Sequence, residues 1–361
     1  MKINYTISTL GYTGGVRTFY EITKRLVKRG YTVTITAIEG VRYPTKYPWK
    51  ARLIRVPRWK EALNIMIFKK ILKNNPHLVF NRQEMLRKQI PDCDINVATD
   101  VLSALPVYRS QKGLLFHHQQ HDETLFSSDL YLRTLAKESY YLPFAVRIAN
   151  SSWLKKRLKE KYGVEAVLIT HAIANEIFYP RKVEKNHDKK RIVSFGKVVE
   201  WKGFKDALEA IKIVMKKRKD IKWFVYGQKL TLPQDLEAPY TFIHFPSDEE
   251  LAKLYSSADV VICPSWYESF PAPPLEAMAC GAPVVTTKYG TEDYAFNEEN
   301  ALVVPPRNPQ AMAQAILRVL EDKNLAEKLR ENGPKTAKQF TWDKTTDQVE
   351  KLFLEKLNEK Q

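Results

Sequence analysis

The sequence predicts an α/β protein with two Rossmann-like domains that face each other across a cleft. The chain has 361 residues, and at roughly 150 residues per domain two domains are expected. Short apolar runs alternate with helix-like segments, a pattern typical of parallel sheets covered by helices. The alternation is interrupted by the polar, charged stretch Arg181–Arg191 and restarts after it, which favours two such domains over one.

The N-terminal half contains the first series of elements. A strand is expected over Ile3–Ser8, followed by a helix over Val16–Arg29 that ends at Gly30. Ser151-Ser152 is a good N-cap for the basic helix Trp153–Tyr162. Further apolar runs predict strands over Thr32–Ala37, Ile95–Thr99, Leu114–His118, Val146–Asn150 and Val167–Thr170.

The C-terminal half repeats the alternation. Strands are expected over Ile192–Phe195, Trp223–Tyr226, Val260–Cys263, Val284–Thr287 and Ala301–Val304. Helices are expected over Lys205–Arg218, Asp248–Ser256, Pro274–Cys280 and Pro309–Leu320. Ligands of such open sheets bind beyond the carboxyl ends of the strands, so the residues that follow each strand carry the most information about function.

The composition is that of a folded protein, with 44% hydrophobic and 27% charged residues. The longest stretch without a charge is Ile3–Val16, shorter than the ~18 apolar residues that a membrane-spanning helix needs. The N-terminus runs directly into a strand pattern instead of the apolar core of a signal peptide, so we expect a cytoplasmic protein. Three widely spaced cysteines suit a reducing compartment and form no metal-ligand pair: Cys93, Cys263 and Cys280.

The charge excess is concentrated in the N-terminal half. The net charge is +17, and residues 1–170 hold 29 Lys and Arg against 13 Asp and Glu, whereas residues 171–361 hold 29 against 28. Such a field attracts lipid headgroups, nucleic acid or a phosphorylated substrate. In Ala51–Asn75 basic residues alternate with bulky apolar ones, as on a surface that rests on an anionic bilayer. The alternatives are the core face of a helix and a merely solvated basic surface.

Glycines follow the first strand. Gly11, Gly14 and Gly15 lie between this strand and the next helix, where they allow backbone N–H groups and a helix N-terminus to approach an anion. An ordinary tight turn from strand to helix uses the same residues, so this signal is weak by itself.

Two lysines follow the first strand of the C-terminal half. Gly196-Lys197 comes directly after the strand, and Lys202-Gly203 ends the connection to the next helix. Two cations here would neutralise the two phosphates of a nucleotide diphosphate in place of a metal ion. A solvated basic loop is the alternative, because runs of charge usually lie on the surface.

Two glutamates eight residues apart follow the strand Val260–Cys263. Glu268 is expected in the loop after the strand, and Glu276 in the first turn of the next helix, which Pro273-Pro274 begins. Carboxylates accept hydrogen bonds from sugar hydroxyls, so the two groups could hold several hydroxyls in one cleft. The alternative for Glu276 is that it only complements the helix dipole.

At these glutamates the chain resembles the family-4 (group 1) glycosyltransferases, retaining enzymes of the GT-B fold that use nucleotide-sugar donors. Their signature, E-x7-E followed by Ala-Met-Ala-x-Gly-x-Pro-Val-Val, is matched by Glu268, Glu276 and Ala277–Val285. Ser194–Lys197 with Lys202-Gly203 is similar to the family's diphosphate site. The resemblance covers most of the C-terminal half and is weaker in the N-terminal half, where Gly14–Arg17 is similar to the family's Gly-Gly turn.

The resemblance implies a role for each matching residue. Glu276 would accept hydrogen bonds from the ribose, and Glu268 would contact the donor sugar. Lys197 and Lys202 would bind the diphosphate and stabilise its charge as it departs. The remaining donor-binding positions would be Gly14, Gly15, Gly196, Ser269, Phe270 and Pro271.

Two positions depart from the family pattern. Lys197 stands where Arg is usual, so the positive charge is kept but the bidentate fork is lost. Pro271 stands where Gly is common, so one backbone N–H donor to the sugar is missing.

Several residues compete for the position of the family's catalytic histidine, which follows an N-terminal strand. His121-Asp122 is similar to the common His-Asp ending, so we expect His121 to face the donor sugar, with His118 as the second candidate. A related group with Gln-Asp-x-Glu at this point would place Gln120 there instead. A polar strand end without a catalytic role is the alternative.

No metal ion and no other cofactor are expected. Asp92-Cys93-Asp94 has the D-x-D spacing that binds a metal in the other major glycosyltransferase fold. It precedes the strand Ile95–Thr99, at the wrong end of a parallel strand for a site, and is interpreted as turn chemistry. The two lysines of the diphosphate site would make a metal unnecessary.

The resemblance thus implies a retaining glycosyltransferase with an acceptor-binding domain, residues 1–172, and a nucleotide-sugar-binding domain, residues 173–342. As in the family, a last helix within residues 343–361 is expected to pack back on the N-terminal domain. The donor is expected to be a UDP- or GDP-sugar. The acceptor would be a glycan or lipid-linked intermediate of cell-surface polysaccharide or glycolipid synthesis, with the protein cytoplasmic or peripheral on the inner membrane face.

Three alternatives stay open. A sugar-nucleotide epimerase or a sugar phosphorylase would share the fold, although no signature of either is present. A catalytically silent relative would bind a sugar nucleotide without turning it over. The basic N-terminal half would attract nucleic acid, but it carries no recognised aromatic or Gly-rich nucleic-acid motif.

Overall fold

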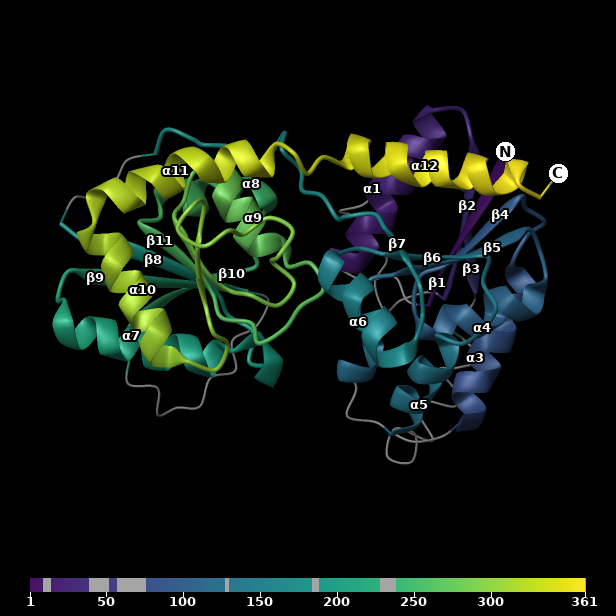
Figure 1. Ribbon diagram of the computed structural model, residues 1–361, viewed down its shortest axis with the longest axis horizontal. Helices are drawn as coiled ribbons and strands as arrows, with labels where there is room; N and C mark the ends of the chain where they lie inside the picture. The colour runs from purple at the N-terminus through teal and green to yellow at the C-terminus, as the bar shows by residue number, and fades with distance from the viewer. Residues whose placement is uncertain are drawn as a thin grey trace. The chain divides into compact units, whose positions relative to one another are not determined.

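The chain divides into two compact α/β units (Figure 1). The computed structural model describes residues 1–8, 14–38, 52–56, 76–126, 130–183, 188–227 and 238–360. Unit 1 comprises Met1–His171 with Trp342–Gln361, and unit 2 comprises Ala172–Thr341. Both divisions lie within one residue of the boundaries expected from the sequence.

Unit 1 is built on a seven-stranded sheet in the order β3-β2-β1-β4-β5-β6-β7, in which every pair of neighbours is parallel. Its strands are β1 (Lys2–Ile7), β2 (Thr32–Ile38), β3 (Arg52–Val56), β4 (Ile95–Ala98), β5 (Leu114–Gln119), β6 (Val146–Ala149) and β7 (Val167–Leu168). The central strands β1 and β4 are buried on both faces, and their polar residues Asn4 and Asn96 bond to each other at 2.9 Å in the interior.

Helices cover both faces of this sheet. They are α1 (Gly14–Lys28), α3 (Pro76–Gln89), α4 (Val101–Ser110), α5 (Leu130–Ser139), α6 (Ser152–Tyr162) and the C-terminal α12 (Trp342–Asn358), with a short 3-10 turn η2 (Glu123–Leu125). Ser151 caps α6 as expected, because its hydroxyl accepts a hydrogen bond from the backbone N–H of Leu154 at 3.1 Å.

The last helix, α12, packs in the core of unit 1 beside α1. Val349 and Phe353 are fully buried there, and the Phe353 ring lies 4.8 Å from that of Phe116 on β5. At the surface, Arg29 forms ion pairs with Asp347, at 2.6 Å, and with Glu350. Unit 1 is therefore completed by a helix that follows unit 2 in the sequence.

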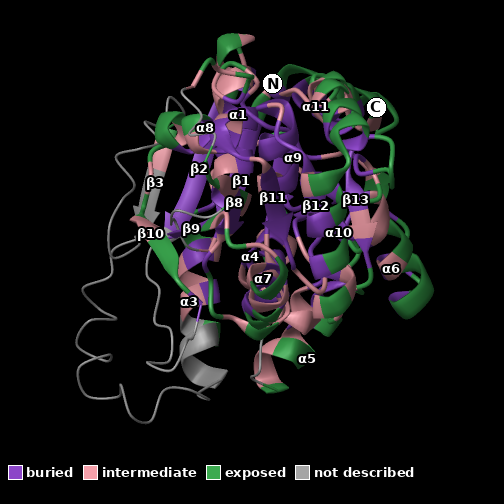
Figure 2. Cartoon of the chain, turned by 90° about the vertical axis from the view of Figure 1, so that its left-hand side faces the viewer, coloured by how far each residue is buried: buried purple, intermediate pink, exposed green. Residues whose placement is uncertain are grey.

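Unit 2 is built on a six-stranded parallel sheet in the order β10-β9-β8-β11-β12-β13. Its strands are β8 (Lys190–Phe195), β9 (Ile221–Gly227), β10 (Tyr240–His244), β11 (Val260–Cys263), β12 (Val284–Thr287) and β13 (Leu302–Val304). Figure 2 shows β11 and β12 buried, whereas the edge strand β10 is largely exposed. The α/β fold with two parallel sheets is confirmed.

The helices of unit 2 form two layers. They are α7 (Phe204–Lys217), α8 (Asp248–Ser257), α9 (Ala272–Ala279), α10 (Pro309–Glu321) and α11 (Lys323–Ala337), with a 3-10 turn η3 (Glu200–Lys202). Two apolar cores result, one containing residues of α7 and α10 and the other residues of α8 and α9. Each face of the sheet is thus buried under helices, as parallel sheets require.

Two expectations about membranes have different outcomes. Within the described ranges, no helix combines the length and the apolar character that a membrane crossing requires. The basic, apolar segment Ala51–Asn75 lies outside the described residues except for β3, so the surface expected there stays a prediction.

Candidate functional site

In each unit the strand order reverses once, between β1 and β4 in unit 1 and between β8 and β11 in unit 2. Loops that leave the carboxyl ends of two such strands diverge to opposite faces of the sheet and leave a crevice, which is where open α/β sheets bind ligands. In unit 2 these loops are residues 196–203 and 264–271, and they contain most of the site residues that the sequence singled out.

The two loops are packed directly against each other. Gly203 has φ +63°, and a Cβ built on it would lie 2.0 Å from the carbonyl oxygen of Pro264. The backbone N–H of Trp266 donates to the carbonyl of Trp201 at 2.7 Å. Only glycine allows this close approach, which explains why Gly203 follows Lys202.

An ion pair joins the loops. The Lys202 ammonium contacts the Glu268 carboxylate, and the Ser265 hydroxyl donates to the same carboxylate oxygen at 2.9 Å. The Lys202 and Glu268 side chains are only 21% and 10% exposed, so their attraction is less screened than that of a surface pair. The structure therefore brings together two residues that lie 66 positions apart and that the sequence assigned to one site.

Lys197 lies close to Lys202 and Glu268. The residue is exposed, yet partial burial of its ammonium group, followed by repulsion from Lys202, lowers its pKa below the ordinary lysine value. The preceding residue, Gly196, donates its N–H to the carbonyl of Tyr226 at 2.7 Å, which fixes the start of the loop on β9. The ammonium groups of Lys197 and Lys202 are thus close to each other and to the Glu268 carboxylate.

A third loop, which follows β12, packs against the backbone of the Glu268 segment. The sequence analysis did not identify this loop as part of the site. Gly290 has φ +93°, and a Cβ there would lie 2.2 Å from the carbonyl oxygen of Glu268. The Glu268 N–H donates to the carbonyl of Tyr289 at 3.2 Å, and the Thr287 hydroxyl donates to the carbonyl of Ser265. The sequence signal that could have revealed this loop is Gly290, which lies three residues after the end of β12.

Ser269, Phe270 and Pro271 connect Glu268 to α9 and are all buried. The Phe270 ring packs 5.1 Å from Tyr294, and the Tyr294 hydroxyl donates to the carbonyl of Pro271 at 2.6 Å. These contacts hold the backbone of the segment in one conformation.

Glu276 is buried in α9, and its place in the helix corrects one expectation. It is the fifth residue of α9, in the second turn, and the first turn contains no acidic residue. The helix begins at Ala272, two residues earlier than the sequence predicted, with Pro273 in its first turn. A residue that far from the free N–H groups gains little from the helix dipole, so the purely structural alternative for Glu276 is weakened.

In unit 1, the expected glycine turn lies at the start of α1. Gly14 and Gly15 are the first two residues of the helix, and a Cβ on Gly15 would lie 3.7 Å from the Gln120 side chain. The side-chain oxygen Oε1 of Gln120 lies 2.5 Å from His171 Nε2. The same nitrogen lies 2.6 Å from the Thr18 hydroxyl. Gln120 is therefore part of a buried polar cluster beside the α1 N-terminus.

The three histidines near the end of β5 differ in their surroundings. His118 is 1% exposed and its ring packs edge-on to Phe19 at 5.3 Å, so it faces the α1 side of the core instead of the crevice. Burial lowers the pKa of His118 and of its neighbour His117 to about 3. His121, after the strand, is only partly buried and lies 4.8 Å from the Phe126 ring. The two histidine candidates thus differ in burial, and the role of each stays a prediction.

Asp122 is a structural residue. It is fully buried, pairs with Arg157 and accepts a hydrogen bond from the Thr124 hydroxyl at 2.6 Å. Burial alone would raise its pKa, but these hydrogen bonds and the arginine outweigh burial and lower it.

The D-x-D sequence forms a turn at the amino end of β4, as expected. Asp94 accepts a hydrogen bond from the Lys2 N–H at 2.6 Å, and Asp92 lies 3.2 Å from the Lys112 ammonium. Among the described residues, no three His, Cys, Asp or Glu side chains converge as metal ligands would.

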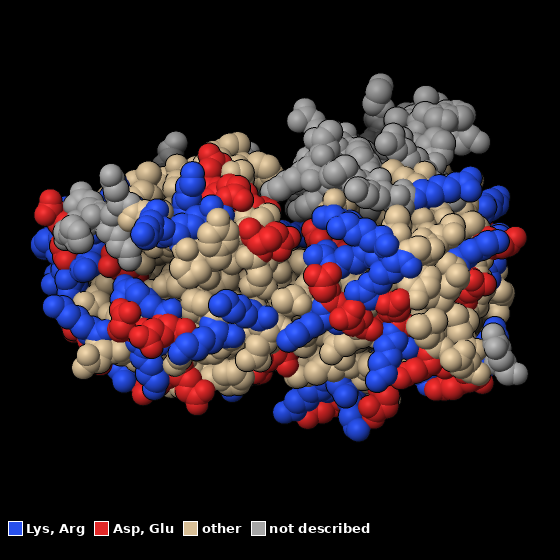
Figure 3. Space-filling view, turned by 90° about the horizontal axis from the view of Figure 1, so that it is seen from above, with Lys and Arg blue, Asp and Glu red and all other residues tan. Residues whose placement is uncertain are grey.

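The charge asymmetry follows the division into units. Unit 1 contains 33 Lys and Arg against 18 Asp and Glu, whereas unit 2 contains 25 against 23. On the face shown in Figure 3, basic and acidic side chains are interspersed on both units. On the part of this face that the structure describes, the basic side chains of unit 1 thus lie among acidic ones.

The unit that contains the β8 and β11 loops matches a known protein family. Residues 175–336 match the family described as Glycosyl transferases group 1. The chain is 31% identical over 193 residues to an uncharacterized glycosyltransferase of Methanocaldococcus jannaschii, a match that covers 50% of this chain and 49% of that protein. The chain thus spans about half the length of this curated relative.

Solved structures share the fold over nearly the whole chain. Sucrose-phosphate synthase from Thermosynechococcus elongatus has a TM-score of 0.80 at 19% identity, with 98% of each chain covered. Anabaena HepE, solved in complex with UDP-glucose, has a TM-score of 0.75 at 18% identity, covering 98% of this chain and 100% of HepE. Residues 175–336 are thus similar to the group 1 glycosyltransferases, and the chain has the GT-B fold.

Proposed function

We propose that this protein is a retaining glycosyltransferase that moves a sugar from a nucleotide-diphosphate donor to a glycan or lipid-linked acceptor without a metal ion. The observation that carries the proposal is the cluster of charged side chains on the β8 and β11 loops, where Lys202 and Glu268 are in contact and Lys197 lies near them. A glycosyltransferase needs cations for a diphosphate and carboxylates for hydroxyl groups, and this cluster contains both.

Lys197 and Lys202 would bind the diphosphate. Lysines shift their pKa readily when desolvated, and the lowered pKa of Lys197 reflects desolvation and repulsion by Lys202 that an anionic ligand would relieve. Because Lys202 is already engaged by Glu268, a diphosphate would exchange partners with this pair and draw the ammonium toward itself. The same two cations would stabilise the nucleoside diphosphate as it leaves.

Glu268 and Glu276 would hold the sugar and the ribose. Glu268 is fixed from three sides, by Lys202, by the Ser265 hydroxyl and by the Tyr289 carbonyl. Glu276 is buried in α9, eight residues further along. Such fixed carboxylates discriminate between hydroxyl arrangements, because a mismatched sugar leaves a buried acceptor without its hydrogen bond. The base would be uracil or guanine, and the UDP-glucose complex of HepE supports uracil.

The reaction would proceed by front-face displacement with retention of configuration. The diphosphate would depart on the side from which the acceptor hydroxyl enters, so the same lysines would stabilise the charge next to the new bond. His121 would contribute from unit 1, which we propose as the acceptor domain with a position on an anionic membrane face, on the basis of its positive charge.

The first experiment measures thermal stabilisation by UDP, GDP, ADP and dTDP without added metal. A ligand at 100 times its dissociation constant stabilises the folded state by about 2.7 kcal/mol, which raises the melting temperature measurably. We expect one nucleotide to do so in the wild type and to lose the effect in Glu276→Ala and Lys202→Ala. Lys205→Ala, which removes an exposed lysine of α7, is the matched control and should respond like the wild type.

Each other outcome has a defined meaning. Stabilisation without turnover of any matching sugar nucleotide would identify a silent binding protein. An inverted anomeric configuration in the product, measured by NMR, would contradict the retaining mechanism. The absence of any shift with all four nucleotides, with or without metal, would overturn the proposal.

A double-mutant cycle tests the exchange of partners directly. Lys202→Ala removes a cation and also leaves Glu268 facing the diphosphate, so Glu268→Gln in the same chain should restore part of the lost nucleotide affinity. Contacting charges are commonly coupled by roughly 0.5–3 kcal/mol. Additive losses in nucleotide affinity would show that Glu268 does not share Lys202 with the ligand.

A further inference from the structure

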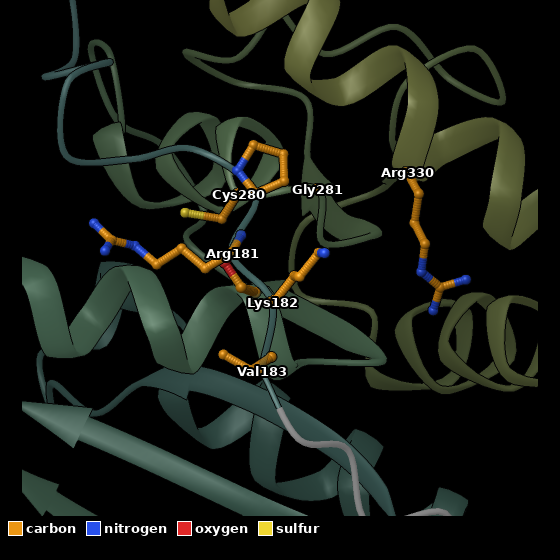
Figure 4. A pocket seen from close by; sticks show the side chains of 8 residues that line it. Arg181, Lys182, Val183, Cys280, Gly281 and Arg330 are labelled. Atoms are coloured by element: carbon orange, nitrogen blue, oxygen red, sulfur yellow. The ribbon is translucent and has the colours of Figure 1, made fainter.

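Unit 2 contains a hollow with a volume of about 570 Å³ (Figure 4). The residues that line it come from the segment that enters unit 2, from the end of α8, from the turn after α9 and from the middle of α11. Those that matter for its chemistry are Arg181, Lys182, Ser256, Gly281 and Arg330.

The hollow is separate from the crevice between the β8 and β11 loops. That crevice lies beyond the carboxyl ends of the strands, where α9 begins. The hollow lies where α8 and α9 end, next to the amino ends of β11 and β12. A ligand here would therefore occupy the opposite edge of the sheet from the donor loops.

The charge of the hollow stands out within its unit. Unit 2 as a whole is nearly balanced, with 25 basic and 23 acidic residues, yet three of the described residues that line the hollow are cations and none of these described residues is acidic. A concave surface with one sign of charge concentrates the field and attracts the opposite charge. An anionic ligand is thus the chemistry that this hollow favours.

The three cations differ in what they already bind. The Arg181 guanidinium pairs with Glu249 on α8 at 2.6 Å and donates to the carbonyl of Ile177 at 2.7 Å. In Figure 4 its side chain points away from Lys182 and Arg330; Lys182 comes from the same segment as Arg181, but its side chain points to the side on which Arg330 lies. Within the described part of the chain, the ion pair of Arg330 is a long contact of 3.9 Å with Glu327. Lys182 and Arg330 are therefore the cations that would meet a ligand, with Arg181 as a structural anchor.

The carbonyl end of α9 does not oppose this. An open helix C-terminus would repel an anion, but the turn at Gly281, with φ +75°, returns the N–H groups of Gly281 and Ala282 to the carbonyls of Met278 and Ala277, both at 3.0 Å. The Ser256 hydroxyl accepts from the Arg181 N–H at 3.2 Å and so ties the entering segment to α8. The wall is thus preorganised by hydrogen bonds that the ligand would not have to break.

We propose that this hollow binds a phosphate group, with Arg330 as a bidentate donor and Lys182 as a point charge. Arginine matches the geometry of phosphate oxygens, and lysine adds charge without demanding one orientation. The phosphate would belong to a soluble molecule or to a lipid headgroup, since both present the same group to the two side chains. Its site would be independent of sugar transfer, because no residue of the donor loops takes part.

The test compares Arg330→Glu and Lys182→Glu with Lys328→Glu, which makes the same charge change on an exposed residue of α11 outside the hollow. All three are made in Lys202→Ala protein, so that the donor loops contribute little to the binding of simple phosphates. Equilibrium dialysis with pyrophosphate and inorganic phosphate measures the soluble source. Flotation with phosphatidylcholine vesicles, with and without phosphatidic acid, measures the headgroup source.

The expected result is binding that Lys328→Glu retains and that Arg330→Glu and Lys182→Glu weaken about tenfold or more, as loss of a charge-assisted contact implies. An effect in dialysis identifies a soluble phosphate, and an effect confined to acidic vesicles identifies a lipid headgroup. Equal behaviour of the three variants in both assays would overturn the proposal. Hydrogen exchange of α9 and α11 establishes that each variant is folded.

Discussion

Units 1 and 2 have the same sheet order around their central strands, yet they use their polar residues in opposite ways. In unit 2 the polar residues after β8 and β11 form the Lys202–Glu268 pair at a crevice. In unit 1 the polar residues at and after the end of β5 are mostly buried: His117, His118, Gln120 and Asp122. A shared topology therefore positions residues at the same edge of a sheet but does not decide whether they bind a ligand or support the fold.

The difference has an energetic side. Unit 2 pairs opposite charges, since Lys202 and Glu268 form an ion pair although their side chains are only 21% and 10% exposed. Unit 1 keeps neutral imidazoles in its interior, so part of its stability depends on their staying unprotonated. The two units should consequently respond differently to acid, to core substitutions and to backbone strain.

Acid should separate the units most strongly. Burial lowers the pKa of His117, His118 and His171 to about 3, whereas the unfolded chain protonates histidine near 6.5. Because the unfolded state binds more protons between these values, each histidine reduces the free energy of unfolding by up to ~1.4 kcal/mol per pH unit as the pH falls. In the described part of unit 2, the one histidine, His244, is exposed.

Hydrogen exchange followed by mass spectrometry from pH 7 to pH 4 measures this, because it reports on each unit by peptide. Unit 1 should lose protection first. Loss of protection in unit 2 at the higher pH would contradict the explanation by buried histidines.

Phe353→Ala should destabilise unit 1 by about 3–5 kcal/mol, the usual cost of emptying a large buried aromatic site. Denaturant unfolding followed by peptide-level exchange measures it. Leu354→Ala, at a neighbouring exposed position of α12, is the control and should cost less than about 0.5 kcal/mol. The nucleotide-dependent stabilisation of unit 2 should survive Phe353→Ala; its loss would mean that the two units do not depend on separate cores.

Gly203→Ala should have a smaller but more local effect, about 3 kcal/mol, because a Cβ would strike the Pro264 carbonyl in a left-handed conformation. The control is Gly163→Ala in unit 1, which has nearly the same φ, +67°, but nothing within 4 Å of the added carbon. That control should cost about 1 kcal/mol. Equal melting temperatures for the two variants would show that the contact between the β8 and β11 loops is not rigid.

Five of the six strands of unit 2 were predicted, whereas β10 was missed. Val260–Cys263 and Val284–Thr287 were predicted to the residue, because buried parallel strands read as short apolar runs between turn residues. The helices α4 and α11 were missed, since Pro106 and Pro334 lie inside them and proline ordinarily ends a helix. In α11, Gly333 beside the proline packs tightly on Met278 of α9, a tertiary contact that local sequence cannot reveal.

The candidate site was predictable where charge and strand ends coincide. Lys202 and Glu268 were assigned to one site from separate segments, and the fold joins them. Gly290 and Tyr289 were not found, because their part is to support a neighbouring backbone and they carry no charge to attract attention. The burial of His118 was not predicted, because the sequence alone does not tell which strand residues face the core.

The position of α12 has a consequence for the order in which the protein forms during translation. Unit 2 is synthesised in full before α12, whereas unit 1 must wait for Val349 and Phe353 to cover its first core. The nascent chain therefore carries an apolar surface of unit 1 through the synthesis of some 170 further residues, long enough for domains to fold one after another. Unit 2 is thereby the first unit whose residues are all synthesised, although it begins second in the sequence.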